Sequence, residues 1–272
     1  MTKNNLAIIV LNWNGADDAL ECINSLARQT LKPTIIIVDN HSHDDSVMRF
    51  EQYQTEHPSV DCIIIANNKN LGFAGGINTG LVYARKQGFE YIGVLNPDAV
   101  ADKNWCRALV DELSSQPKCG IATGILQRRD GKTLDTTGDF YTTWGLPGPR
   151  NRDEPVENAP SKPGEVFGAT GGGAIYRAAM FDDIDMFDED FFMYYEDVDL
   201  SFRAQLAGWK VRFTPKAIAY HKVGASSKKV PGLAVYNTFK NLPLVFIKNV
   251  PGKLFWYIGL RFFLTYWLIF AS

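Results

Sequence analysis

The chain has 272 residues, of which 46% are hydrophobic and 21% charged, and its formal net charge is −2. This balance is that of a globular protein with a full core and excludes a disordered or fibrous chain. The four cysteines are scattered without Cys-x-x-Cys spacing, which favours a reduced, cytosolic setting and argues against a thiolate metal site. Residues 1–5 lead directly into an apolar run, so we expect no secretory signal peptide.

The first third of the chain alternates apolar runs with helical patterns. Continuous apolar runs at 6–11, 34–38 and 61–66 predict strands buried on both faces. The segments between them predict one helix from about Asp17 to before Pro33 and another that ends near Glu56. This order indicates a Rossmann-like, mostly parallel sheet.

A glycine-rich turn follows at residues 70–80 and leads into a helix predicted from Ile77 to Lys86. Glycines at a helix start allow the backbone to approach a phosphate or a sugar closely. The spacing is not the Gly-x-Gly-x-x-Gly fingerprint of dinucleotide sites. An ordinary surface turn is the alternative interpretation.

The run Tyr91–Leu95 predicts a fourth buried strand, which Pro97 ends because proline has no N–H to donate. Asp98 then lies beyond the carboxyl end of the strand, where open α/β sheets bind ligands. A carboxylate there could hold a divalent cation and, through it, a diphosphate. The alternative is an Asn-Pro-Asp turn that merely caps the next helix.

A helix over 104–113 and a strand over 121–126 precede residues 127–165, which show no clear period. We interpret this stretch as a functional loop or lid, with 146–163 as its most mobile part. Short strands are predicted at 174–177, 211–213 and 218–220, and His221 follows the last of them. A lone histidine after a strand is more often structural than a ligand.

Three acids, Glu196, Asp197 and Asp199, stand in the first turn of a predicted helix, directly after the aromatic run 191–195. Acids in this position complement the helix dipole, which is a sufficient structural explanation. The aromatic run would also desolvate an inward-facing carboxylate and raise its pKa, as suits a general base.

The C-terminal quarter is basic. Residues 1–199 carry 17 Lys and Arg against 30 Asp and Glu, whereas residues 200–272 carry 11 Lys and Arg and no acid. Basic residues interleaved with aromatic ones predict a helix that lies in an anionic membrane interface. A helix packed on the domain, or a surface for another subunit, is the alternative. Nothing resembles a nucleic-acid-reading module, so we expect no nucleic acid partner.

Five ordered motifs carry a family resemblance. They are residues 10–14, 38–44, 70–80, 95–98 and 191–203, and together they resemble the family 2 glycosyltransferases of GT-A fold, in particular the bacterial rhamnosyltransferase branch. The resemblance implies an α/β fold with a mixed, mostly parallel sheet flanked by helices. It divides the chain into a GT-A domain over 1–226 and a basic, aromatic helical tail over 227–272. The domain would comprise a nucleotide-sugar half (1–126) and an acceptor and catalytic half (127–226), which contains the lid.

The resemblance also assigns roles to residues. It implies that Trp13 lies against the nucleotide base, that Asp39 accepts the pyrimidine N3–H, and that Asp197 is the general base. Asp98 matches the last acid of the family's Asp-x-Asp metal motif, with Asn96 in place of the first, and His221 matches a histidine that completes the Mg²⁺ or Mn²⁺ site in several relatives. The remaining donor-site candidates are Asn12, Gly72, Phe73, Gly76, Asn78 and Asn96, and the acceptor-side candidates are Glu196, Asp199 and Gly172.

The function implied is an inverting, metal-assisted transfer from a nucleotide-diphospho-sugar, with dTDP-L-rhamnose favoured and a UDP-sugar as the competitor. The acceptor would be a cell-surface glycan, free or linked to polyprenyl diphosphate, reached at the cytoplasmic face of the membrane. Two other classes of function stay open. A non-catalytic, sugar-nucleotide-binding scaffold subunit would explain why Asn96 replaces the first acid of the metal motif. A nucleotidyltransferase would need a glycine-rich, basic loop after the first strand, which the sequence lacks.

Overall fold

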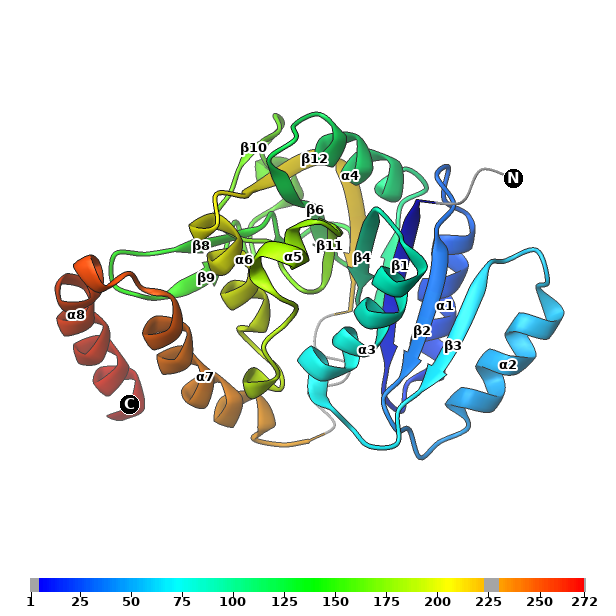
Figure 1. Ribbon diagram of the computed structural model, residues 1–272, viewed down its shortest axis with the longest axis horizontal. Helices are drawn as coiled ribbons and strands as arrows, with labels where there is room; N and C mark the ends of the chain where they lie inside the picture. Colours follow the sequence, from blue (N-terminus) through cyan, green and yellow to red (C-terminus); the bar gives the residue numbers. More distant parts are fainter. Residues whose placement is uncertain (1–4, 223–229, 272) are drawn as a thin grey trace.

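The computed structural model describes residues 5–222 and 230–271. Its first part alternates strands and helices as the apolar runs predict (Figure 1). These elements are β1 (Leu6–Asn12), α1 (Ala16–Ala27), β2 (Thr34–Asp39), α2 (Ser46–Glu56), β3 (Cys62–Ala66), α3 (Gly72–Gln87) and β4 (Tyr91–Leu95). Strands β3, β2, β1 and β4 are neighbours and all parallel, so their carboxyl ends share one edge of the sheet.

The second part of the chain extends the same sheet. Its elements are β5 (Ala99–Ala101), α4 (Trp105–Ser114), β6 (Cys119–Arg128), β7 (Leu134–Thr136), β8 (Asp139–Tyr141), β9 (Pro147–Pro149), η1 (Val156–Asn158), β10 (Gly164–Glu165), β11 (Gly173–Arg177), α5 (Met180–Ile184), η2 (Glu189–Phe191), α6 (Glu196–Leu206) and β12 (Lys210–His221). The main path of the sheet is β10-β12-β6-β11-β4-β1-β2-β3. Only β11 interrupts the parallel run from β12 to β3, because it is antiparallel to both β4 and β6.

Two apolar layers cover the sheet because alternate residues of each buried strand face opposite sides. Ile8 and Val10 of β1 pack with α1, α2 and α4, whereas Ala7 and Ile9 pack with α3, α5 and α6. This three-layer arrangement is the mixed α/β fold that the resemblance implied. In such folds ligands bind at the edge formed by the carboxyl ends of the parallel strands.

Two segments differ from the sequence-based expectation. The predicted strands at 211–213 and 218–220 are one strand, β12, whose register shifts between Phe213 and Ile218 around Pro215. Residues 127–165 contain short strands rather than only irregular chain: β7 pairs with β6, β8 pairs with β9, and β10 pairs with β12. Whether part of this stretch acts as a lid stays a prediction.

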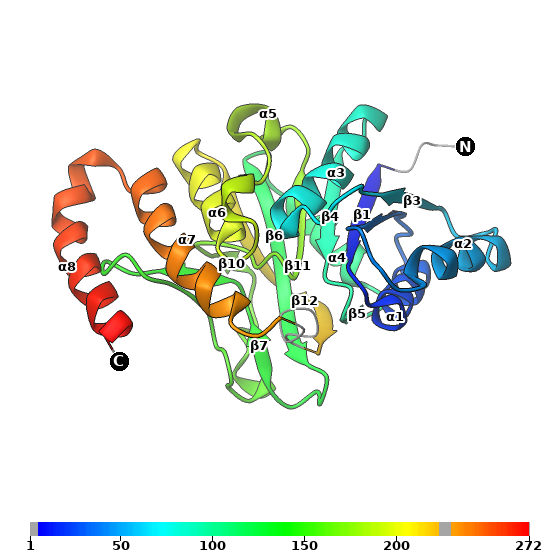
Figure 2. The ribbon, with the colours of Figure 1, turned by 90° about the horizontal axis from the view of Figure 1, so that it is seen from below.

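The C-terminal segment forms two helices, α7 (Leu233–Asn249) and α8 (Gly252–Ala271). Figures 1 and 2 show α7 beside α6, with α8 outermost at the end of the molecule opposite the N-terminal strands. The two helices pack through Phe246 and Phe262, whose rings stack with centroids 4.6 Å apart. Within the described residues, neither these helices nor any other combines the length and the apolar character needed to cross a bilayer.

Candidate functional site

A cavity of about 670 Å³ lies at the carboxyl-end edge of the sheet. Its walls come from both halves of the chain: β1 and the start of α3 on one side, and β11, α6 and the end of β12 on the other. The predicted site residues that line it are Trp13, Gly72, Phe73, Asn96, Asp98, Gly172, Glu196, Asp197 and His221. The structure therefore brings together residues that are more than two hundred positions apart in the sequence.

Asp98 and His221 meet because β5 pairs with the end of β12, with Ala99 opposite His221. The His221 Nε2 lies 3.0 Å from Asp98 Oδ1, and Nδ1 lies 2.8 Å from Asp135 Oδ2. Burial lowers the pKa of His221, but the hydrogen bonds to Asp135 and Asp98 outweigh it and raise that pKa to about 9. Asn96 Nδ2 completes the cluster, 3.3 Å from His221 Nε2.

This cluster has the donor atoms that a divalent cation needs, provided that the cation displaces the proton that the raised pKa keeps on His221. Among the described residues no group of three or more His, Cys, Asp or Glu side chains is placed to hold a metal ion. Mg²⁺, however, is commonly bound by one or two carboxylates together with substrate phosphates and water. Asp135 holds Nδ1 of His221 and leaves Nε2 facing Asp98, which is the arrangement of a carboxylate–histidine metal ligand pair. Asp98 and His221 thus fit two positions of a coordination shell that the diphosphate would help to fill.

Asp197 lies in the first turn of α6 and faces the cavity. Its Oδ2 accepts a hydrogen bond from the Gly171 N–H at 2.7 Å, and its Oδ1 accepts one from the Val198 N–H at 2.8 Å. Burial raises the pKa of Asp197, and these two N–H groups partly oppose that rise because they stabilise the anion. A carboxylate that is buried, fixed and still able to ionise is suited to accept a proton.

Asp39 and Asn12 lie deeper than the cavity wall. Asp39 is 2% exposed, and its oxygens accept hydrogen bonds from Asn12 Nδ2 (2.9 Å), Ser42 Oγ (2.6 Å) and the Ser42 N–H (2.9 Å). A pyrimidine N3–H would have to share this carboxylate with those donors. Trp13 does line the cavity, and its buried Nε1–H has no acceptor among the described residues.

The glycine-rich turn is held in place by Asn40. Its amide donates to Asn70 Oδ1 and to the Gly72 carbonyl, both at 2.9 Å, and its Oδ1 accepts from the Leu71 N–H. Gly76 approaches β1 so closely that a Cβ there would lie 2.5 Å from Leu11. Asn78 points away from the cavity and bonds both the carbonyl and the N–H of Phe187. The donor-binding roles of Gly76 and Asn78 stay predictions.

Sequence reasoning missed several residues of the site. Asp135, Asp139 and Arg152 line the cavity from the stretch that showed no period, and Arg152 pairs with Asp135 at 2.9 Å. Asp139 is 7% exposed, and burial followed by the charge of Asp197 raises its pKa well above the ordinary value. No local pattern marks these residues, because long-range contacts bring them to the cavity: β7, which holds Asp135, pairs with β6, β8, which holds Asp139, pairs with β9, and Arg152 pairs with Asp135.

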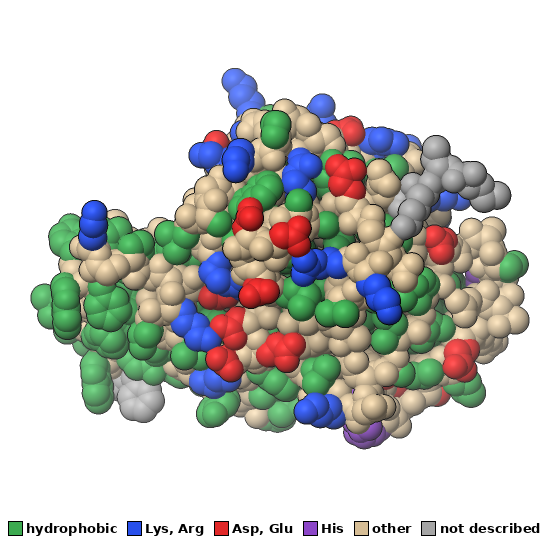
Figure 3. All heavy atoms as spheres, viewed as in Figure 1, with side chains coloured by type: hydrophobic (Ala, Val, Ile, Leu, Met, Phe, Trp, Pro, Cys, Tyr) green, Lys and Arg blue, Asp and Glu red, His purple; other side chains and the backbone are tan. Residues whose placement is uncertain are grey.

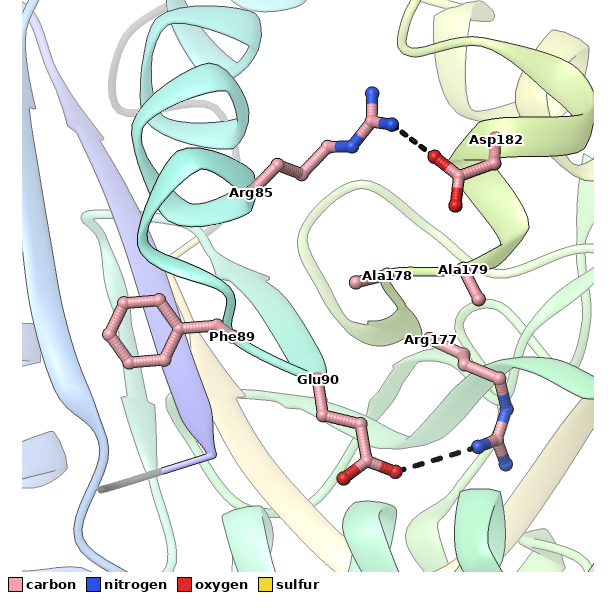
Figure 4. Close-up of a pocket in the computed structure, with 7 residues that line it drawn as sticks. All are labelled: Arg85, Phe89, Glu90, Arg177, Ala178, Ala179 and Asp182. Atoms are coloured by element: carbon pink, nitrogen blue, oxygen red, sulfur yellow. Dashed lines mark hydrogen bonds and ion pairs between the residues drawn. The ribbon is translucent and has the colours of Figure 1, made fainter.

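A second cavity lies at the opposite end of β4 and β11 (Figure 4). Its charged residues are already matched, since Arg85 pairs with Asp182 and Arg177 lies 3.8 Å from Glu90. Arg177 also donates to the carbonyls of Cys119 and Leu113, which ties it to the end of α4. We therefore assign the chemistry to the cavity at the carboxyl-end edge.

Comparison with known proteins agrees with this geometry. The sequence profile of glycosyl transferase family 2 matches residues 7–185. The N-acetylglucosaminyl-diphospho-decaprenol L-rhamnosyltransferase of Mycobacterium tuberculosis is 24% identical over 249 residues, which cover 83% of this chain and 78% of the relative. A low-salt glycan biosynthesis hexosyltransferase of Haloferax volcanii is 26% identical over 210 residues, 74% of this chain and 62% of the relative.

Solved structures share the fold at low sequence identity. A mannosyltransferase of Pyrobaculum calidifontis, in complex with GDP-Man and Mn²⁺, has a TM-score of 0.66 at 16% identity and covers 94% of this chain and 68% of its own. GalNAc-T7 with UDP, GalNAc and Mn²⁺ has a TM-score of 0.65 at 13% identity, with 79% of this chain and 43% of its own covered. From its profile match, fold and site, the chain belongs to glycosyl transferase family 2 and is a glycosyltransferase.

Proposed function

We propose that the enzyme transfers L-rhamnose, with inversion, from dTDP-L-rhamnose to a hydroxyl of a cell-surface or polyprenyl-diphosphate-linked glycan. The observation that carries the proposal is the placement of Asp197, a buried carboxylate fixed by two N–H groups, across the cavity from the Asp98–His221 pair. Of the comparisons, the rhamnosyltransferase relative supports the choice of sugar and of a lipid-linked acceptor.

In the proposed reaction Asp197 accepts the proton of the acceptor hydroxyl as that oxygen forms a bond to the anomeric carbon. The bond from this carbon to the diphosphate breaks at the same time, and its electron pair leaves with the nucleoside diphosphate. Asp98 and His221 would hold Mg²⁺ or Mn²⁺, which when bound neutralises charge on the diphosphate. Trp13 packs against the base, and the backbone near Gly72 and Gly172 allows the sugar and phosphates to approach.

We also propose that the C-terminal helices contact an anionic membrane surface at the cytoplasmic face. Support comes from the apolar side chains that cover α8, of which Trp256 is 83% exposed and Leu260 79% exposed. Figure 3 shows hydrophobic side chains gathered over this end of the molecule. Lys253 and Arg261 lie on the same helix, and residues 200–272 contain no acid to repel anionic lipid. A lipid-linked acceptor would be reached from such a position.

Calorimetric binding of dTDP-L-rhamnose, UDP-glucose and GDP-mannose with Mn²⁺ tests the donor and the metal site. We expect wild type and Asp197→Asn to bind dTDP-L-rhamnose alike, because Asp197 acts on the acceptor, and Asp98→Ala to bind it weakly. Transfer by Asp197→Asn should fall by about 10² to 10⁴ because general-base help is lost.

Other outcomes of these binding and transfer experiments would lead to different conclusions. Selective UDP-sugar binding would keep the mechanism and replace the sugar. Wild-type turnover in Asp197→Asn would remove that residue from its role. Donor binding by wild type without transfer to a broad acceptor panel would favour the scaffold function, which the amide of Asn96 in place of a carboxylate would then explain.

A further inference from the structure

The segment that leads into α6 has an unusual backbone. Residues 191–195, here called the aromatic loop, run from the last residue of η2 to the start of α6, and residues 192–195 of this loop line the cavity. Phe192, Tyr194 and Tyr195 have φ angles of +63°, +70° and +69°. Positive φ is costly for bulky residues and persists only where the surrounding structure enforces it. The contacts that enforce this conformation are therefore part of what shapes the site.

Asn241 on α7 supplies those contacts. Its side chain is fully buried, and Nδ2 lies 2.8 Å from the Phe191 carbonyl, 2.9 Å from that of Met193 and 2.8 Å from that of Tyr194. Of the other two carbonyls in this run, that of Phe192 accepts from the Ala74 N–H of α3, and that of Tyr195 accepts from the Asp199 N–H of α6. The aromatic loop is thus held from two sides, by the glycine-rich start of α3 and by α7.

The loop continues without a break into the general base. Tyr195 is the residue before α6, and Asp197 is the second residue of that helix. Further contacts join α7 to this region: Lys248 binds Asp188 and Asp190 near η2, and Asn249 Nδ2 donates to Asp199 Oδ1 of α6 at 2.7 Å. The family profile ends at residue 185, so both the base and α7 lie beyond the matched range.

We propose that Asn241 is a positioning residue of the transfer reaction: by holding three carbonyls of the aromatic loop, it fixes Asp197 and keeps water from it. The C-terminal helices are then part of the active site and not only a membrane contact. The proposal rests on Asp197 acting as the base, as argued under the proposed function.

Asn237 offers a matched control. It lies one turn earlier on α7 and is 2% exposed, and among the residues that the structure describes its Nδ2–H donates within its own helix, to the Leu233 carbonyl. Asn241→Leu and Asn237→Leu therefore each replace a buried amide of the same helix by an apolar side chain of similar size. Only the first removes contacts to the loop.

Three readouts test the proposal. Relative to Asn237→Leu, we expect Asn241→Leu to lower kcat by about 10- to 100-fold, since a small misplacement of a catalytic group costs about this much, while donor Kd stays within about twofold. Hydrogen exchange over residues 191–195 should speed up in Asn241→Leu alone. The pH at half-maximal kcat should move down, because burial is what raises the pKa of Asp197.

The charged and titratable groups that face Asp197 are unchanged by either substitution, so the pH shift reports water access. They are Asp139 from β8, Glu196 from α6, Tyr176 from β11 and Tyr195 from the loop. If Asn241→Leu does not fold, Asn241→Ser, which keeps one donor, should show the same three changes to a smaller degree.

Equal kcat, exchange and pH profile in the Asn241 and Asn237 variants would overturn the proposal. A fall in kcat that follows only the fraction of folded enzyme, with an unmoved pH profile, would also overturn it and leave Asn241 a structural residue. Wild-type enzyme that transfers no sugar from any donor would instead overturn the proposed function, and exchange would still decide whether Asn241 holds the loop.

Discussion

Three carboxyl groups share one wall of the cavity, and their surroundings separate their roles. Burial raises the pKa of Asp197, Glu196 and Asp139, but only Asp197 accepts hydrogen bonds from two neighbouring N–H groups that favour its anion. Glu196 Oε2 is buried without a partner in the described residues. Where close carboxyl groups compete for ionisation, the one with donors ionises first. This supports the proposal that Asp197, rather than Glu196 or Asp139, is the base.

The raised pKa of Asp139 has a consequence for stability. Folding raises the pKa of this carboxyl group above its value in the unfolded chain, which is near 3.8. The group contributes its full stabilisation at pH values below the unfolded-state pKa. This contribution is lost as the pH rises through the pKa of the folded state. Asp139→Asn should therefore match wild type near pH 4 and be more stable than wild type at pH 8. Denaturant unfolding at both pH values measures this difference.

Asp111→Asn is the control, because its carboxylate is 65% exposed and water already stabilises the charge. We expect it to change stability by no more than about 0.5 kcal/mol at either pH. An Asp139→Asn variant whose stability relative to wild type is the same at pH 4 and pH 8 would show that Asp139 is not protonated in the folded state.

Local sequence patterns identify those site residues that stand directly at the ends of apolar runs. Asp98 follows the strand β4, and Asp197 lies in the first turn of α6 behind the aromatic run, so both could be found from the sequence. Asp135 and Asn241 could not, because each reaches the site by a contact across many residues: Asp135 bonds His221, and Asn241 bonds the aromatic loop. Single-sequence patterns carry no information about such pairings.

At the scale of elements, the glycine-rich start of α3 and the aromatic loop fit each other. Gly72 has φ +70°, and a Cβ there would lie 2.4 Å from the Phe192 carbonyl oxygen. Gly131 has a similar φ of +66° but no atom within 4 Å of a built Cβ. At both positions the positive φ favours glycine over any residue with a side chain. At Gly72 a side chain would in addition collide with Phe192.

We expect Gly72→Ala to weaken donor binding and lower transfer, because the aromatic loop must move to admit the methyl group. Gly131→Ala should cost only the strain of positive φ, about 1 kcal/mol, with activity unchanged. Unfolding and turnover of both variants measure the difference. Equal losses in the two would mean that the contact with Phe192 adds nothing beyond the backbone preference.

Element prediction succeeded where periodicity was long and failed where strands were short. The strands β1 to β4 and their helices follow from continuous apolar runs and helical patterns. The strands β7, β8 and β9 have three residues each, too few to show an alternation, and long-range pairing decides them. The strand β12 looked like two strands because Pro215 interrupts its pattern, although the chain continues through the irregularity.

At the scale of the molecule, the mixed sheet brings the proposed metal-ligand pair and the proposed base to one cavity, and α7 joins that region to α8. The ring of Phe246 on α7 stacks on Phe262 of α8, so the two helices form one unit whose inner side contacts the aromatic loop. The outer side of α8 presents Trp256, Leu260 and Trp267 to solvent. The cavity and the exposed apolar side chains of α8 therefore lie on connected elements.

This arrangement predicts binding to lipid vesicles through α8. Wild type should float with vesicles containing anionic lipid, and less so at about 1 M than at about 0.1 M salt, because salt screens the basic residues. Leu260→Glu should lower partitioning by about 10- to 100-fold, since a leucine side chain contributes roughly 1.5–3 kcal/mol on burial and the added charge is repelled. Leu206→Glu, at an isolated leucine of α6 that is 55% exposed, is the matched control and should float as wild type does. Equal flotation of the two variants would place lipid binding elsewhere, and no flotation of wild type would assign the apolar face of α8 to a protein partner instead.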